Sequence, residues 1–131
     1  MNNKFRVWCK NKNQWETDYC VLTSDGVLLH RVRNTWVPLN KDTHIIQFGT
    51  GLEDKNGKEI FEGDIVFAIA TYDCANMVVV WDDGGFVLVP CKYYKNYISR
   101  CGYKDIRFLD KEVVGNIFES ENLLEVANGQ H

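Results

Sequence analysis

The chain has 131 residues, of which 45% are hydrophobic and 25% charged, and its formal net charge is -3. This length is that of one ordinary domain, which can bury a core without disulfides or a metal. The acidic balance excludes a whole-chain attraction to nucleic acid or anionic membranes, so binding to nucleic acid would need a local basic patch. No apolar run approaches the roughly 20 residues that span a bilayer, and the first residues lack the apolar stretch of a signal peptide. We expect a cytoplasmic protein with no membrane partner.

The N-terminal part of the chain predicts five strands. They are expected at residues 4–9, 18–23, 26–32, 35–38 and 43–48. In the strand at 4–9, Phe5, Val7 and Cys9 lie on one face, which should be buried, and Arg6 and Trp8 lie on the other. Gly26 should turn the second strand into the third, and Gly49 and Gly51 should end the fifth.

Two turns and an apolar run occupy the centre of the chain. Asn56-Gly57 is a strong turn signal, and Glu62-Gly63-Asp64 is a second turn. The residues that follow, 65–70, are apolar throughout and rich in β-branched types, which predicts a strand buried on both faces. The segments 77–82 and 86–91 should form a hairpin through the glycines at 84 and 85.

The C-terminal part predicts a mixture of short elements. The spacing of tyrosines favours a short helix at 92–98, ended by Gly102, and residues 106–108 could return to the sheet. A strand is expected at 112–118, with a bulge at Gly115, and Ser120 could cap a final helical turn. Many short strands separated by glycine turns predict a mainly β fold, either a small barrel or a sandwich.

The central run from Gly51 to Val66, GLEDKNGKEIFEGDIV, resembles the signature of the YopX family of phage and prophage proteins. Three further stretches agree in order and spacing: KFRVW at 4–8, VVW at 79–81, and EVVGNIFE at 112–119 followed by Asn122, Leu123 and Leu124. Residues 92–105 match no family pattern. The resemblance implies an SH3-like β-barrel in the C-terminal part, an N-terminal β-hairpin or meander, and one or two short helices. It implies a single domain over 1–131, with an N-terminal β subregion at 1–50 and the barrel at 51–126. It implies no catalytic activity and no functional residues.

The acidic residues around the two central turns could suggest a carboxylate pair or a metal site. Turn chemistry is the favoured interpretation, because Asp and Asn bond nearby backbone groups and glycines adopt positive φ. The structural signature turns are therefore assigned to Asn56, Gly57, Glu62, Gly63 and Asp64.

The five cysteines include no CxxC pair and no histidine at a zinc-site spacing, which favours reduced, partly buried thiols with no metal and no cofactor. The histidines, His30, His44 and His131, are far apart. A nucleophilic Cys–His pair would have to be assembled by the fold.

Residues 92–107 carry five cationic side chains against one acidic one, a net charge of +4, interleaved with tyrosines. Cations that neutralise phosphates, beside rings that stack on bases, are typical of single-stranded nucleic-acid binding. The alternative, which we favour, is a tyrosine face docked on the barrel with its charges in solvent. The candidate patch for nucleic acid or a partner is Lys92, Tyr93, Tyr94, Lys95, Tyr97, Arg100, Tyr103, Lys104 and Arg107.

No catalytic constellation is visible, so the sequence favours a non-enzymatic phage accessory protein that binds a host or phage protein. Exposed Trp8, Trp15 or Trp36 would be suitable anchors, because tryptophan dominates interface energetics. Nucleic-acid binding through 92–107 is the alternative. Homo-oligomerisation would cover the open strand edges of an incomplete barrel.

Overall fold

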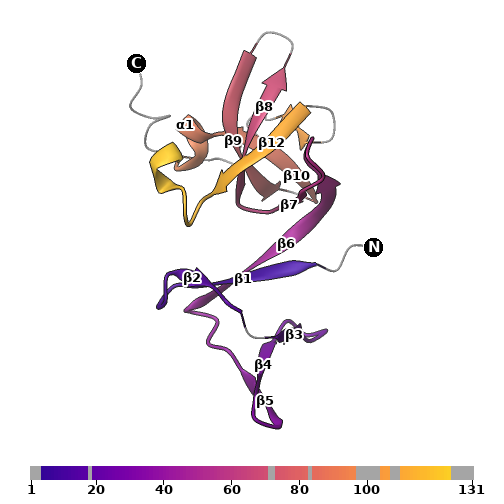
Figure 1. Cartoon of the computed structure of the whole chain (residues 1–131), viewed down its shortest axis with the longest axis vertical. Coiled ribbons are helices and arrows are strands. Elements are labelled where there is room, and N and C mark those ends of the chain that lie inside the picture. Colours follow the sequence, from indigo (N-terminus) through magenta and orange to yellow (C-terminus); the bar gives the residue numbers. More distant parts are fainter. Residues whose placement is uncertain are drawn as a thin grey trace. The chain divides into compact units, whose positions relative to one another are not determined.

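The computed structural model of the chain describes residues 4–17, 19–70, 73–82, 84–96, 104–106 and 110–124. The fold is mainly β, as predicted, with antiparallel strands and short helical turns (Figure 1). The chain divides into an N-terminal unit, Phe5–Gln47, and a C-terminal unit made of Lys4 and the residues from Phe48 onward. None of the helices in the described ranges is long and apolar enough to cross a membrane.

The N-terminal unit contains a β-hairpin and a three-stranded meander. In the hairpin, Trp8 pairs with Trp15 and Cys9 with Gln14, and β1 has the start of β6 on its other side. The meander has the strand order β3-β4-β5. The strands are β1 (Phe5–Cys9), β2 (Gln14–Trp15), β3 (Cys20–Leu22), β4 (Leu28–Val32), β5 (Thr35–Pro38) and β6 (His44–Glu53).

The C-terminal unit is built on a curled five-stranded antiparallel sheet with the strand order β11-β10-β9-β8-β12. This barrel-like sheet agrees with the predicted fold class. Its SH3-like type stays a prediction. The remaining elements are β7 (Glu59–Phe61), β8 (Asp64–Ala70), β9 (Asp73–Asp82), β10 (Gly85–Pro90), α1 (Cys91–Tyr94), β11 (Lys104–Asp105) and β12 (Asp110–Asn116). A further helical turn lies at 121–124.

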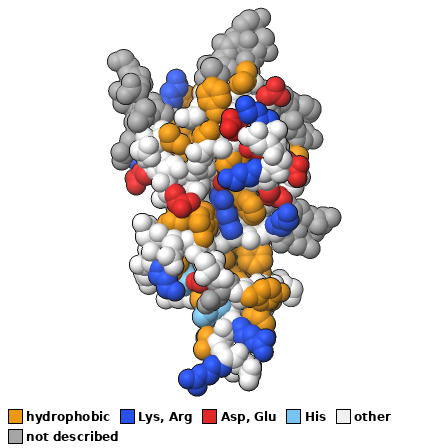
Figure 2. Space-filling model, in the orientation of Figure 1, with side chains coloured by type: hydrophobic (Ala, Val, Ile, Leu, Met, Phe, Trp, Pro, Cys, Tyr) orange, Lys and Arg blue, Asp and Glu red, His pale blue; other side chains and the backbone are white. Residues whose placement is uncertain are grey.

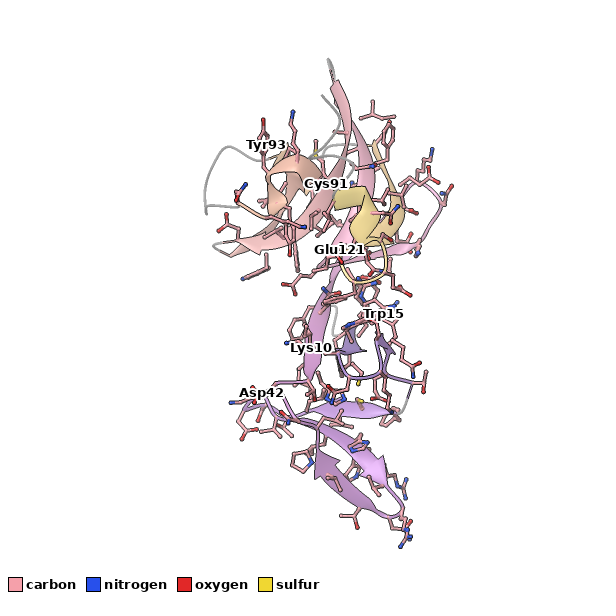
Figure 3. The ribbon with its side chains drawn as sticks, turned by 90° about the vertical axis from the view of Figure 1, so that its left-hand side faces the viewer. Lys10, Trp15, Asp42, Cys91, Tyr93 and Glu121 are labelled. Carbon is pink, nitrogen blue, oxygen red and sulfur yellow. The ribbon has the colours of Figure 1, made fainter. Side chains whose placement is uncertain are left out.

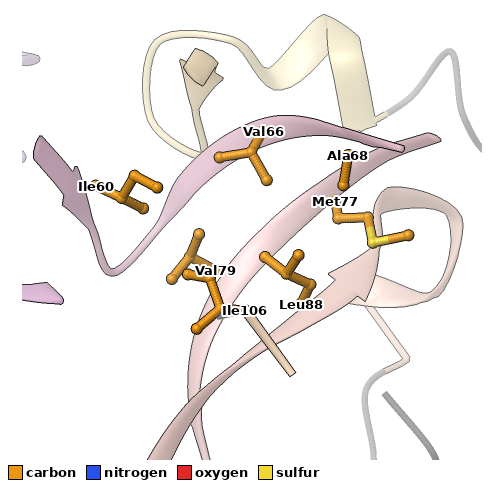
Figure 4. Close-up of a cluster of buried hydrophobic side chains, with 7 residues drawn as sticks. All are labelled: Ile60, Val66, Ala68, Met77, Val79, Leu88 and Ile106. Atoms are coloured by element: carbon orange, nitrogen blue, oxygen red, sulfur yellow. The ribbon is translucent and has the colours of Figure 1, made fainter. Parts of the chain in front are cut away.

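Each face of the five-stranded sheet covers its own hydrophobic cluster. The larger cluster lies on the concave side (Figure 4) and consists of Ile60, Val66, Ala68, Met77, Val79, Leu88 and Ile106. The smaller cluster lies under α1 and the helical turn and consists of Ile65, Val78, Cys91 and Leu124. Successive residues of β8 and β9 therefore enter opposite clusters, which explains why both strands are apolar without alternation.

Several predicted details are wrong, and each has a physical reason. Trp8 is only 4% exposed, so the end of β1 is buried on both faces and not on one. β6 continues through Gly49 and Gly51, because the irregular β6–β7 register absorbs them as a bulge. In β8, Phe67 and Ile69 are 37% and 52% exposed, because the helical cover ends before their part of the sheet.

Helix and strand limits also differ at the C-terminal end. The expected helix at 92–98 is the single turn α1, and the predicted stop at Gly102 lies outside the described residues. Ile106 is buried against the larger cluster directly after β11. The bulge at Gly115 is confirmed by the register shift between Val113 and Gly115 in the β12–β8 pair.

The turn Glu62-Gly63-Asp64 connects β7 to β8, and its central residue, Gly63, is hydrogen bonded on both sides. The Gly63 amide donates to the Val79 carbonyl at 2.8 Å, and the Gly63 carbonyl accepts from the Ile117 amide at 2.9 Å. Gly63 is buried and has φ of 84°, a conformation that side chains with a Cβ disfavour. The turn therefore holds the start of β8 between β9 and the residues that follow β12.

Asp54 is a buried carboxylate, 7% exposed, that joins the 54–58 turn to β12. Its Oδ1 accepts from the amides of Asn56 and Lys58, both at 2.9 Å, and its Oδ2 accepts from the amide of Val113, also at 2.9 Å. Burial by itself raises the pKa of Asp54. The three backbone hydrogen bonds and the charge of Lys58 outweigh it, so the pKa lies below its ordinary 3.8.

The chain after β12 folds back on the bulge. The Asn116 side-chain oxygen accepts from the amides of Phe118 and Glu119 at 3.0 and 2.9 Å, which forms a tight turn. Ser120 precedes the helical turn, as predicted, and its hydroxyl oxygen accepts from the Asn116 amide at 3.3 Å. This turn brings Ser120 directly against Gly115.

We expect Gly115→Ala to destabilise the protein by about 1–3 kcal/mol, because a rigid overlap in a packed region costs that much. A Cβ at this position would lie 2.2 Å from Ser120 Oγ, 2.7 Å from Ser120 Cβ and 3.3 Å from Leu123 Cδ1. The measurement is the urea unfolding midpoint. Gly85→Ala is the matched control, because a Cβ there meets nothing within 4 Å. Equal midpoints for the two variants would contradict the expectation. Adding Ser120→Gly to Gly115→Ala removes the overlapping side chain and should recover part of the lost stability.

We expect Asp54→Asn to destabilise the protein by about 2–3 kcal/mol at pH 7, because an amide cannot accept all three backbone N–H groups. A lowered folded-state pKa means that Asp54 stabilises the fold above its ordinary pKa of 3.8 and loses this contribution as the pH falls through the folded value. The difference in the free energy of unfolding between wild type and Asp54→Asn should therefore shrink as the pH falls below the folded-state pKa. The measurement is urea unfolding at pH 7 and along a descending pH series. Exposed Asp110→Asn is the control, and a gap from wild type that stays constant with pH would refute this role of Asp54.

Candidate functional site

One face of the β3–β4–β5 sheet exposes large apolar side chains. Tyr19 is 74% exposed and Trp36 is 42% exposed, and their rings lie 6.0 Å apart. Arg31 pairs with Trp36 across β4 and β5, so these two side chains share the face. Figure 2 shows hydrophobic and cationic side chains side by side over this part of the N-terminal unit. We call this surface, made of Tyr19, Val21, Leu29, Arg31, Trp36 and Pro38, the aromatic face.

The strand register explains why these residues share one side. Val21 pairs with Leu29, and Leu29 with Pro38, so a row of apolar side chains runs across all three strands beside the Arg31–Trp36 pair. The opposite side of the sheet carries Leu28, which is only 6% exposed. The meander therefore buries Leu28 on that side, although Val32 there is 43% exposed, and it leaves Tyr19, Arg31 and Trp36 of the aromatic face in solvent.

The hairpin between β4 and β5 presents two arginines beside the aromatic face. Arg31 Nε donates to the Arg33 carbonyl at 3.1 Å, and its Nη2 donates to Asn34 Oδ1 at 3.4 Å. Arg33 has φ of 58°, a left-handed conformation that costs an L-residue about 1–2 kcal/mol. The hairpin thus holds an exposed arginine where a glycine would be less strained.

The three tryptophans proposed as anchors have different environments. Trp8 is buried, which makes it wrong as an exposed anchor. Trp15 packs edge-on against Trp8 at 5.0 Å with the Arg6 guanidinium 4.3 Å above its ring, so it is half-buried within the β1–β2 hairpin (Figure 3). Trp36 alone of the three is exposed. Sequence reasoning missed its neighbour Tyr19, although the alternation of Tyr19 and Val21 with the residues between them was a usable signal.

The residues of the predicted patch at 92–107 do not form one described surface. Lys92, Tyr93 and Lys95 are exposed, with the Lys92 Nζ 5.1 Å from the centre of the Tyr93 ring. Figure 3 shows Tyr93 pointing away from the sheet and Cys91 lying on the inner side of α1. Tyr94 packs on the smaller cluster, and burial together with the nearby charge of Glu62 raises its pKa. Lys104 lies on β11, and Tyr97, Arg100, Tyr103 and Arg107 lie outside the described residues.

The C-terminal unit has its own exposed aromatic pair. Trp81 is 51% exposed and meets Phe86 edge-on at 4.9 Å, on paired positions of β9 and β10. Phe86 packs against the larger hydrophobic cluster. This pair therefore closes one end of the core, whereas Tyr19 and Trp36 stand on a surface of a thin meander.

The signature carboxylates bind backbone groups. Asp64 is 2% exposed and its Oδ2 accepts from the Phe61 amide at 2.8 Å, and Asp54 is engaged as described above. Glu59 accepts from the Gly51 amide at 3.1 Å and pairs with Lys4 at 3.3 Å. These contacts give Asp54, Glu59 and Asp64 structural roles in holding turns and strands together.

Among the described cysteines, Cys9 and Cys91 are buried and Cys20 is half-buried, all as free thiols. Burial raises the pKa of Cys91 to about 11, so this thiol is a poor nucleophile. One group of side chains in the described ranges could hold a metal ion: Cys9, Glu16 and His44. Sequence spacing did not reveal it, because the three residues meet only when β1, β2 and β6 come together.

The fold and surface together define a small β protein with a curled five-stranded sheet and an exposed aromatic meander. A family model described as YopX protein matches residues 4–125, and the chain belongs to the YopX family. No curated protein matches the sequence.

Solved structures share this fold, among them the following two. The crystal structure of protein yopX from Bacillus subtilis is 21% identical with a TM-score of 0.58, over 94% of this chain and 98% of that one. Protein EF1440 from Enterococcus faecalis is 23% identical with a TM-score of 0.56, over 92% of this chain and 96% of that one. The family assignment agrees with the resemblance found in the sequence.

Proposed function

We propose that this chain is a non-enzymatic binding module that holds a protein partner against the aromatic face. The observation that carries the proposal is the exposed row of Tyr19, Arg31 and Trp36 across the three-stranded sheet. Tryptophan, tyrosine and arginine are the residue types that contribute most to protein interfaces. An apolar surface of this kind in solvent is typical of a docking site.

The charges beside the aromatic face indicate the chemistry of the partner. Arg31 and Arg33 are exposed at its hairpin end. A matching partner would offer an apolar segment with acidic side chains, since complementary charges steer encounter and fix orientation. The strained φ of Arg33 supports this view, because backbone strain tends to be retained where it serves a site.

The biological setting is part of the same proposal. The YopX resemblance supports a phage or prophage accessory role, with the cytoplasm of the bacterial host as the place of action. The partner would then be a host or phage protein. A second copy of the chain is another outcome to measure, because β11 and β12 end the described part of the curled sheet and leave edges that pairing could cover.

The test is a peptide-display selection on the purified chain, followed by calorimetry with the peptides that are enriched. We expect apolar sequences with acidic residues, bound at least about 30-fold more weakly by Trp36→Ala, since a hot-spot truncation costs about 2 kcal/mol or more. Arg31→Glu should also weaken binding, and added salt should weaken wild-type binding.

Trp81→Ala is the matched control, because Trp81 is also exposed and also contacts a second aromatic ring. It should leave the affinity unchanged. Equal losses for Trp36→Ala and Trp81→Ala, or enriched peptides without the apolar and acidic pattern, would overturn the proposal. Light scattering on the free chain shows whether a second copy takes the place of the partner.

Nucleic-acid binding through α1 is the second candidate, favoured by the exposed Lys92–Tyr93 pair and the exposed Lys95. If it holds, a labelled single-stranded oligonucleotide should be shifted in a gel at low salt, and Lys92→Glu with Lys95→Glu should abolish the shift. Lys10→Glu with Lys12→Glu, an equal charge change at exposed positions of the N-terminal unit, is the control. A shift that survives the α1 variant, or no shift at low salt, would exclude this site.

A further inference from the structure

We propose that Cys9, Glu16 and His44 form a zinc-binding site inside the N-terminal unit. One ligand atom from each residue lies within 4.8 Å of the other two. The three side chains are well covered: Cys9 is 2% exposed, and the side chains of Glu16 and His44 are 7% and 12% exposed. A thiol, an imidazole and a carboxylate are the three ligand types that proteins use for zinc.

Strand pairing brings the three residues together. Cys9 is the last residue of β1 and pairs with Gln14, so the chain turns back at once and delivers Glu16, whose amide donates to the Val7 carbonyl at 2.8 Å. The Lys10 amide donates to the Thr43 carbonyl at 2.8 Å, which places the start of β6 beside the end of β1. The ligands therefore come from backbone that is already fixed by the sheet.

The orientation of the His44 ring favours a metal. Its Nδ1 lies 3.0 Å from the Asn40 carbonyl oxygen and 3.0 Å from the Thr43 hydroxyl oxygen. With the hydrogen on Nδ1, the ring donates to the Asn40 carbonyl, and the lone pair of Nε2, which lies 3.5 Å from Glu16 Oε2, is left for a metal. Histidines that bind metals usually donate their other ring nitrogen to a carbonyl or carboxylate in this way, which fixes the tautomer and the ring plane.

The distance between the His44 and Glu16 ligand atoms fits a shared zinc ion better than a direct hydrogen bond. His44 Nε2 and Glu16 Oε2 are 3.5 Å apart, whereas charge-assisted N–O hydrogen bonds are about 2.7–2.9 Å. Two ligand atoms about 2.0–2.2 Å from a tetrahedral zinc ion lie about 3.4 Å from each other. A thiolate and a carboxylate would also balance the two charges of Zn²⁺, which a buried site requires.

The same residues are poorly placed for nucleophilic catalysis. A cysteine nucleophile must be reachable by its substrate, and Cys9 is almost completely buried. A triad also places its carboxylate and its nucleophile on different ring nitrogens. Here the carboxylate is at Nε2 and the backbone carbonyl is at Nδ1. Converging donors in a covered position are instead typical of a metal that stabilises the fold.

The test uses the full chain, reduced and freed of metal by a chelator, and titrated with Co²⁺ as a spectroscopic probe. We expect one ion per chain, a thiolate-to-cobalt charge-transfer band in the near ultraviolet, and displacement of the band by Zn²⁺. Zinc should also raise the thermal unfolding midpoint, because it binds the folded state. The wild-type spectrum is informative without any variant, so a variant that fails to fold does not block the test.

Variants then identify the ligands. Cys9→Ser should abolish the charge-transfer band, and Glu16→Gln and His44→Gln should each weaken zinc binding by at least about 100-fold, more than the loss of a supporting contact. Cys20→Ser is the matched control, because Cys20 is a free thiol of the same unit outside the cluster. Trp36→Ala should keep full zinc affinity, which separates this site from the aromatic face.

Two results would overturn the proposal. The first is a folded, reduced wild-type chain that binds neither Co²⁺ nor Zn²⁺ with one-to-one stoichiometry. The second is a charge-transfer band that survives Cys9→Ser or disappears in Cys20→Ser, which would assign the thiolate elsewhere. In either case the Glu16–His44 contact is a polar contact of the fold and not half of a metal site.

Discussion

The C-terminal unit depends on the backbone of Gly63, which is hydrogen bonded on both sides inside the protein. Its amide is tied to β9 and its carbonyl to the residue after β12, at a φ of 84°. Because β8 begins at the next residue, this one peptide sets the position of β8 between its two neighbours in the sheet. Asp64 stabilises the same corner by accepting from the Phe61 amide. A buried turn of this kind leaves little freedom for the strand that follows it.

A second constraint ties the strand β12, at one edge of the five-stranded sheet, to the turn at residues 54–58. The carboxylate of Asp54 accepts hydrogen bonds from three backbone amides, two within its own turn and one on β12. Lys55 adds an ion pair with Glu112 at 3.3 Å on the outside, which is exposed and contributes little by comparison. The signature run of the family is thus a set of turns whose polar groups hold strands distant in sequence. Its acidic residues are explained by folding and not by chemistry.

The two units place their chemical features differently. The C-terminal unit uses most of its large apolar side chains in two clusters, one on each side of the sheet. The N-terminal unit has a thin meander that leaves Tyr19 and Trp36 in solvent. Beside it, the β1–β2 hairpin and the start of β6 bring together a thiol, a carboxylate and an imidazole. The proposed docking face and the proposed zinc site therefore both belong to the smaller unit, whose limited core would gain from a metal that binds on folding.

The sequence by itself determined the longer strands, the main turns and the family, but not the short strands β2, β7 and β11. Alternation and glycine turns located the meander, the β9–β10 hairpin and the bulge at Gly115, because these depend on local backbone preferences and neighbouring residues. It could not tell that Trp8 is buried and Trp36 exposed, since both occur in similar short strands and only packing distinguishes them.

Tertiary structure alone brought Cys9, Glu16 and His44 together. Their spacing along the chain resembles no metal motif, because strand pairing and not a single loop supplies the geometry. The same holds for the aromatic face, where Tyr19 and Trp36 meet across an intervening strand. Local sequence fixes which residues a strand presents, and the pairing of strands decides which of them become neighbours.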